Sequence, residues 1–149
     1  MSEFNEGFQN SPTIETLPEN MKLKLASDPL RILEGEYASG NHLKVTNLAH
    51  CLGVGLKDEV RQFAVAAHVG PFGGEKYDKV NQIDVWADGY VDQLAQQFGS
   101  EQQPSSIIIR SRQIGSRPLF HGRMMEALKR KFSDAQIDTK NETDFEITF

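Results

Sequence analysis

The chain has 149 residues, of which 38% are hydrophobic and 25% charged, so we expect one globular domain and not a collagen, a coiled coil or a disordered chain. No apolar run approaches the roughly 20 residues of a transmembrane helix, and residues 1–20 lack the features of a secretory signal, so neither membrane insertion nor Sec export is expected. The formal net charge is −5, and Cys51 is the single cysteine, which excludes an intramolecular disulfide and suits a reducing compartment.

Residues 1–20 differ from the rest of the chain. They contain four glutamates and neither Lys nor Arg, and their apolar residues stand singly or in pairs. Such a segment cannot bury enough surface to offset the entropy lost on ordering. We therefore predict a flexible acidic tail over residues 1–20 and a folded domain over residues 21–149.

Short extended segments separated by turn residues fill the first half of the domain. Alternating or continuous apolar residues predict strands at 23–25, 30–33, 42–48, 51–56 and 63–69. Gly35, Gly40 and Asn41 predict a turn before the third of these. The last two segments flank the polar residues Lys57–Glu59 and predict a hairpin, after which a loop extends to about residue 82.

The second half alternates helices and strands. Apolar residues at helical spacing predict a helix over 87–98, with Asp84 or Asp88 near its start and Gly99 ending it. A buried strand follows at 105–109, and a second helix is expected from the capping residue Ser116 to Phe132. With further strands at 135–137 and 145–149, the pattern predicts an α+β layered sandwich: a mostly antiparallel sheet of about six strands with two main helices on one face.

The predicted hairpin places one cysteine and one histidine at its base. Cys51 begins the first strand and His68 lies near the end of the second, so their side chains are able to meet. A thiol and an imidazole in contact form a minimal cysteine nucleophile with its base. An imidazolium partner predicts a thiol pKa below the ordinary value of about 8.5. Each residue alone is more typical of a buried structural position.

Several short motifs surround this pair. A Gly35-Glu-Tyr37 segment precedes Leu48-Ala-His-Cys51-Leu-Gly-Val-Gly-Leu56, and Asp58 and Ala67-His68 follow. This arrangement resembles the CheD family of chemoreceptor glutamine deamidases, whose Gly-Glu-Tyr segment precedes a Leu-Gly-Ser-Cys-Val motif and whose Cys-to-His spacing is the one seen here. The resemblance covers about residues 30–137 and extends to deamidating toxins related to cytotoxic necrotizing factor. Ala49-His50 replace the family's Gly-Ser, which indicates a divergent member.

The resemblance implies hydrolysis of a glutamine side-chain amide in a protein substrate, without a cofactor or a metal. On this basis Cys51 is the nucleophile that forms a thioester, and His68 is its base and the acid for the leaving ammonia. Thr46 matches the residue that orients the imidazole in the family, and backbone amides around Cys51 are expected to hold the oxyanion.

Two other interpretations stay open. His50, Cys51 and His68 carry zinc-type donors, but neighbouring strand residues point to opposite faces and no fourth ligand is evident. Alternatively, the domain is a catalytically inactive CheD-like fold that binds a protein partner. Rapid alkylation of an activated thiol would distinguish catalysis from this second alternative.

The segment Arg110–Lys131 has seven basic residues against the single acid Glu126. Four of its arginines, Arg110, Arg112, Arg117 and Arg123, would face an acidic protein partner, although charges of this kind more often lie on solvated helix and loop positions. Nucleic acid is not expected, because aromatic residues do not alternate with these charges. His42 and His121 are expected on the surface. The expected location is the cytoplasm, or a host cell that receives the protein as a secreted effector.

Overall fold

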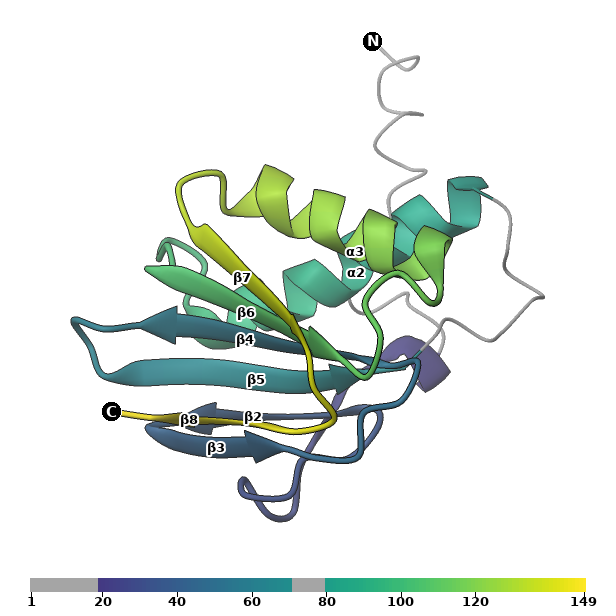
Figure 1. Cartoon of the computed structure of the whole chain (residues 1–149). Coiled ribbons are helices and arrows are strands. Elements are labelled where there is room, and N and C mark those ends of the chain that lie inside the picture. The colour runs from purple at the N-terminus through teal and green to yellow at the C-terminus, as the bar shows by residue number, and fades with distance from the viewer. Residues whose placement is uncertain (1–18, 71–79) are drawn as a thin grey trace, which may run out of the picture.

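The computed structural model describes residues 19–70 and 80–149, and these form three layers (Figure 1). The helices α2 (Val80–Phe98) and α3 (Pro118–Lys131) cover one face of a six-stranded sheet, and a two-stranded sheet of β3 (His42–Val45) and β8 (Phe145–Thr148) lies on the other. The α+β sandwich is therefore confirmed. The predicted tail, apart from the short 3-10 helix η2 (Glu19–Met21), and most of the predicted loop after Gly70 lie outside the described residues.

The strands of the large sheet follow the order β1-β2-β5-β4-β6-β7. The inner pairs are antiparallel, and the outermost pair on each side is parallel. The strands are β1 (Lys24–Leu25), β2 (Glu36–Gly40), β5 (Phe63–Val69), β4 (Leu52–Asp58), β6 (Ser106–Ser111) and β7 (Gln136–Asn141).

Strand β2 corrects the prediction of a turn between Gly35 and Asn41. Its sequence has weak strand propensity, and pairing with β5 and β1 decides its conformation. The predicted strand at 30–33 is likewise wrong, since it forms only an isolated bridge between Ile32 and Val45. The helix expected to begin near residue 87 begins at Val80, so Asp88 lies inside it.

The two central strands are buried on both faces. Leu52, Val54 and Leu56 pack under the helices, whereas Gly53 and Gly55 face the two-stranded sheet. A Cβ atom on Gly53 would lie 2.6 Å from the Phe145 ring, too close for any real side chain. The glycines of β4 therefore allow the second sheet to approach the first.

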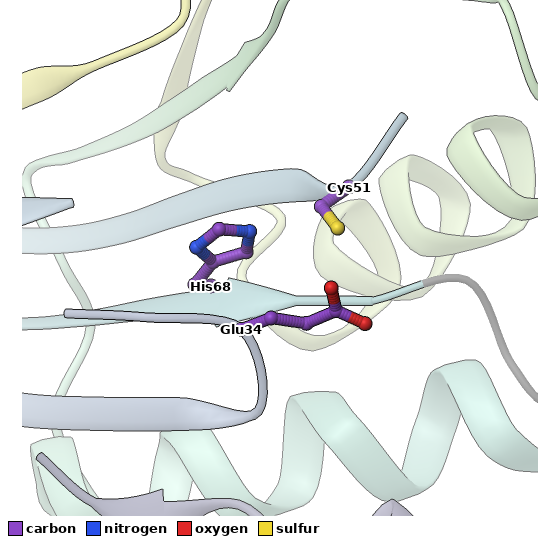
Figure 2. A group of neighbouring side chains, drawn as sticks. All are labelled: Glu34, Cys51 and His68. Carbon is purple, nitrogen blue, oxygen red and sulfur yellow. The ribbon is translucent and has the colours of Figure 1, made fainter. Parts of the chain in front are cut away.

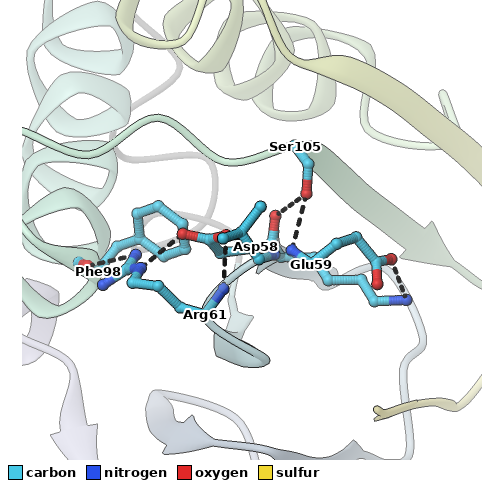
Figure 3. Close-up of polar contacts among 7 residues, drawn as sticks. Asp58, Glu59, Arg61, Phe98 and Ser105 are labelled. Carbon is cyan, nitrogen blue, oxygen red and sulfur yellow. Dashed lines mark hydrogen bonds and ion pairs between the residues drawn. The ribbon is translucent and has the colours of Figure 1, made fainter.

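Polar contacts fix the far end of the β4–β5 hairpin (Figure 3). The Asp58 carboxylate accepts the backbone N–H groups of Val60 and Arg61 and the Arg61 Nε–H. Arg61 also donates to the carbonyl oxygen of Phe98 at the end of α2, at 3.1 Å, and its guanidinium lies 4.6 Å from the centroid of that ring. The hairpin is thus anchored to the helix layer, and its opposite end carries Cys51 and His68.

The ends of the helices differ in how they are formed. Gly99, with a φ of +117°, ends α2 as predicted. Ser116 does not cap α3, because Arg117 occupies the N-cap position and no side chain caps it. The two helices are joined by the ion pair of Arg130 with Asp88 at 2.7 Å. None of the helices described is both long and apolar enough to span a bilayer.

Candidate functional site

Cys51 lies at the entry to β4, directly before Leu52. In a strand, alternate residues share a face, so the Cys51 side chain lies on the same side as Gly53 and Gly55. It belongs to the core between the two sheets and is 7% exposed. The thiol therefore sits at the edge of a packed layer and not in an open loop.

His68 reaches the same position from β5. It pairs directly with Gly53, so the thiol two residues earlier is its diagonal neighbour on one face. Because Gly53 has no side chain, nothing on β4 separates the imidazole from the sulfur. The hairpin brings Cys51 and His68 together as predicted (Figure 2).

A third side chain, Glu34, joins this pair. One carboxylate oxygen of Glu34, the Cys51 sulfur and a ring nitrogen of His68 all lie within 4.8 Å of one another (Figure 2). The Glu34–Gly35 turn is held against β5 by a 2.8 Å hydrogen bond from the Gly35 N–H to the His68 carbonyl oxygen. Gly35 has a φ of +83°, a conformation that favours glycine.

Gly70 provides the space that Glu34 occupies. A Cβ atom on Gly70 would lie 2.5 Å from the Glu34 Oε2 atom. Sequence reasoning did not identify Glu34, because the residue stands outside the periodic apolar pattern and reaches the site through the pairing of β2 with β5. The local sequence signal for Glu34 was the following Gly35, because a glycine at this place indicates a turn that can direct a neighbouring side chain toward the site.

The surroundings of the thiol favour its protonated form. Burial, followed by the charge of Glu34 and a hydrogen bond to it, raises the pKa of Cys51 to about 12. Burial also lowers the pKa of His68, partly opposed by the carbonyl groups of Ile32 and Thr46 and by the charge of Glu34. The pair is thus a neutral thiol and a neutral imidazole near pH 7. This corrects the expectation of a thiol pKa below 8.5, because desolvation and a carboxylate outweigh the attraction of an imidazolium.

Thr46 directly follows β3, at the start of the segment that leads to Cys51. Its backbone carbonyl is close enough to the His68 ring to favour the protonated imidazole. Its hydroxyl oxygen is buried and has no hydrogen-bond partner among the described residues. Thr46 therefore approaches the predicted site, and the group facing His68 is its backbone carbonyl.

The loop before Cys51 is held by two side chains from beyond the hairpin. The Ser111 hydroxyl donates to the Ala49 carbonyl oxygen at 3.0 Å. The His121 Nδ1 atom accepts the Gly115 N–H, so its Nε2–H donates to the His50 carbonyl oxygen at 2.9 Å. His121 is 1% exposed, which corrects its expected place on the surface. Burial is also the main reason that its pKa is lowered.

His50 does not share the site of Cys51 and His68. Its exposed ring contacts the Ser116 hydroxyl at 3.2 Å, on the side of α3. The alternative in which His50, Cys51 and His68 bind a metal together is therefore wrong. Neighbouring residues of an extended chain point to opposite faces, which separates His50 from Cys51. Among the described residues, the group with metal-binding donors in reach of one another is Glu34, Cys51 and His68.

The arginines predicted to bind an acidic partner have different surroundings. Arg110 is 6% exposed and bonds to Asp138 and Glu142, so it cannot serve as part of that surface. Arg123 pairs with Glu126 of its own helix. Arg112 and Arg117 are exposed in the loop before α3.

Comparisons with known proteins give a similarity in structure but no match to a family model or a curated protein. Among solved structures, the chain is similar to the Bacillus licheniformis hypothetical protein YfiH, with 13% sequence identity and a TM-score of 0.42. The match covers 85% of this chain and 66% of that chain, so this chain spans just under two thirds of the neighbour's length.

Proposed function

We propose that the chain is a cysteine-dependent amidohydrolase that converts a glutamine side chain of a protein substrate into glutamate and ammonia. The observation that carries this proposal is the placement of the Cys51 sulfur and a His68 ring nitrogen within 4.8 Å, on one face of an anchored hairpin. The resemblance of the segment around Cys51 to CheD deamidases supplies the choice of substrate.

The neutral state of the pair defines the first step. The Cys51 sulfur attacks the side-chain carbonyl carbon of glutamine while the thiol proton moves to His68, so the S–C bond forms without a free thiolate and the negative charge passes to the carbonyl oxygen. His68 then gives that proton to the amide nitrogen, the C–N bond breaks and ammonia leaves. Water attacks the resulting thioester with His68 again as base, which releases glutamate and restores the thiol.

Two neighbouring groups would assist this sequence. The Glu34 carboxylate favours the protonated imidazole, which is the form that His68 takes after accepting the thiol proton. The backbone N–H of Cys51 favours negative charge at the sulfur, and it is a candidate donor to the oxyanion of the tetrahedral intermediate. In this mechanism Glu34 and the backbone stabilise charge that develops during the reaction.

The proposal is tested by mass spectrometry of glutamine-containing proteins incubated with the purified chain. We expect the mass increase of an amide converted to an acid, and hydroxylamine should divert the thioester to a hydroxamate. Cys51→Ser and His68→Ala should each abolish both products, with losses that are not additive. His42→Ala is the matched control, since it removes an exposed imidazole that contacts Glu146 on the outer sheet. Full turnover by Cys51→Ser would refute the mechanism.

One observation favours the second candidate, a catalytically inactive binding domain. The raised pKa of Cys51 is typical of a buried structural thiol. In that case the exposed Arg112 and Arg117 would bind an acidic protein partner. A domain of this kind would give neither a deamidated product nor a hydroxamate, and its partner binding would survive Cys51→Ser but weaken in Arg112→Ala.

A further inference from the structure

We propose that Glu34, Cys51 and His68 form a binding site for one divalent cation of the zinc class. The proposal concerns the site itself and holds whether or not the chain hydrolyses amides. Four features support it: a buried imidazole without a hydrogen-bond partner, the chemistry of the three donors, the space made for Glu34, and the separation of the donor atoms.

The first feature is the state of His68. The residue is 2% exposed, and neither ring nitrogen has a hydrogen-bond partner among the described residues. Buried polar side-chain atoms are normally paired, and a buried group without a partner needs an explanation. A metal ion on one nitrogen provides that partner. The carbonyl groups of Ile32 and Thr46 lie near the ring, and a carbonyl is the usual partner of the second nitrogen of a metal-bound histidine.

The second feature is the donor set. A thiolate, an imidazole and a carboxylate are all established zinc ligands, and a soft sulfur donor disfavours magnesium and calcium. A divalent cation would be neutralised by the Cys51 thiolate and the Glu34 carboxylate, with His68 neutral. The same cation removes the repulsion that the carboxylate and a thiolate would otherwise have.

The third feature is the position of Glu34. Its carboxylate lies over Gly70, where any Cβ atom would displace it. Gly70 therefore allows a carboxylate to stand beside the sulfur. The backbone hydrogen bond from the Gly35 N–H to the His68 carbonyl oxygen holds the neighbouring Glu34 next to His68 on β5.

The fourth feature is the separation of the donor atoms. The three donor atoms lie within 4.8 Å of one another, whereas zinc bond lengths require separations of about 3.3–3.6 Å in a tetrahedral site. The hairpin fixes the backbone of Cys51 and His68, and small rotations of these two side chains and of the exposed Glu34 would bring the three donor atoms to those separations. Three protein ligands, of which Glu34 is exposed, leave the fourth position of a tetrahedral ion for water or another ligand, as in catalytic zinc sites.

Occupancy has a consequence that rests on the proposed function. A sulfur bonded to the cation and an imidazole bonded through its ring nitrogen cannot carry out nucleophilic attack and proton transfer. We therefore expect zinc to inhibit amide hydrolysis and a chelator to restore it.

Cobalt titration of the untagged full chain, freed of metal with a chelator, tests the site without reference to activity. We expect one Co²⁺ per chain, a thiolate-to-cobalt charge-transfer absorbance, and its loss when one equivalent of Zn²⁺ displaces the cobalt. Cys51→Ser should remove the charge-transfer band, and His68→Ala should weaken binding by more than about 100-fold, beyond the cost of losing an outer-shell partner.

Glu34→Gln is the decisive variant, because the residue is exposed and its substitution leaves the core unchanged. It should weaken zinc binding at least about tenfold, whereas the matched variants Glu146→Gln, which removes an exposed carboxylate of the outer sheet, and His50→Ala should bind as the wild type does. Absence of the charge-transfer band in the wild type, or equal affinity in Glu34→Gln and the wild type, would overturn the metal site. Neither result would bear on thioester formation, which is measured in the presence of chelator.

Discussion

The reactivity of Cys51 gives the sharpest test of the site's electrostatics. Burial and Glu34 raise the pKa of this thiol to about 12, from an ordinary value of 9.0. At neutral pH this difference reduces the thiolate population roughly 1000-fold. A more basic thiolate is also more nucleophilic, which recovers about 15–30-fold for disulfide exchange. The metal-free protein should therefore react about 30–60-fold more slowly than a cysteine peptide, before any loss from limited access.

The assay follows the rate of reaction with an uncharged disulfide, dithiodipyridine, as a function of pH in the presence of chelator. The midpoint of the profile is independent of access, so it reports the thiol pKa directly. Glu34→Gln removes the charge and the carboxylate acceptor, so the midpoint should fall. It should stay above 9.0, because burial is the largest cause of the shift and persists in the variant.

Two matched variants separate charge from structural change. Glu36→Gln removes a carboxylate that lies two residues after Glu34 and does not act on the thiol. The midpoint of the pH profile of this variant should equal that of the wild type. Gly70→Ala should displace the Glu34 carboxylate through the added methyl group and shift the midpoint as Glu34→Gln does. A wild-type midpoint at or below 8.5 would refute this reasoning and restore an imidazolium as the dominant neighbour of the sulfur.

Three further predictions concern packing, pH and orientation. Gly53→Ala places a methyl group against the second sheet and should destabilise the fold by about 1–3 kcal/mol in denaturant unfolding. The control Gly122→Ala adds a methyl group that meets no neighbouring element within 4 Å, so it should stabilise α3 by up to about 1 kcal/mol. Equal effects of the two variants would contradict the close packing of the sheets. The pKa values of His68 and His121 are lowered in the folded state, so unfolding takes up protons. The free energy of unfolding should therefore fall as the pH drops below about 6.5, by up to about 1.4 kcal/mol per pH unit for each histidine. A free energy of unfolding that stays constant from pH 7 to 5 would show that both histidines titrate normally. Thr46→Ala should reduce turnover less than His68→Ala does, because the carbonyl facing the imidazole is retained; an equal loss of kcat would assign a direct role to the hydroxyl.

The sequence by itself determined two of the three layers of this protein, the helices and the large sheet, but not the separate sheet of β3 and β8. Helical spacing over residues 87–98 and 116–132 and the continuous apolar runs on either side of Lys57–Glu59 required two helices over a buried sheet, because each element had an apolar surface to cover. The hairpin also placed Cys51 and His68 at one end of adjacent antiparallel strands. That part of the candidate site followed from chain direction and strand spacing alone.

Tertiary structure decided what surrounds that pair. Pairing with β5 made β2 a strand, and the turn before it brought Glu34 to a thiol seventeen residues further along the chain. Local spacing carries no information on such a contact, because it depends on which strands lie next to each other in the sheet. The protonation of Cys51 depends on this carboxylate and on burial, so the chemistry of the pair was set by long-range packing and not by the motif that contains it.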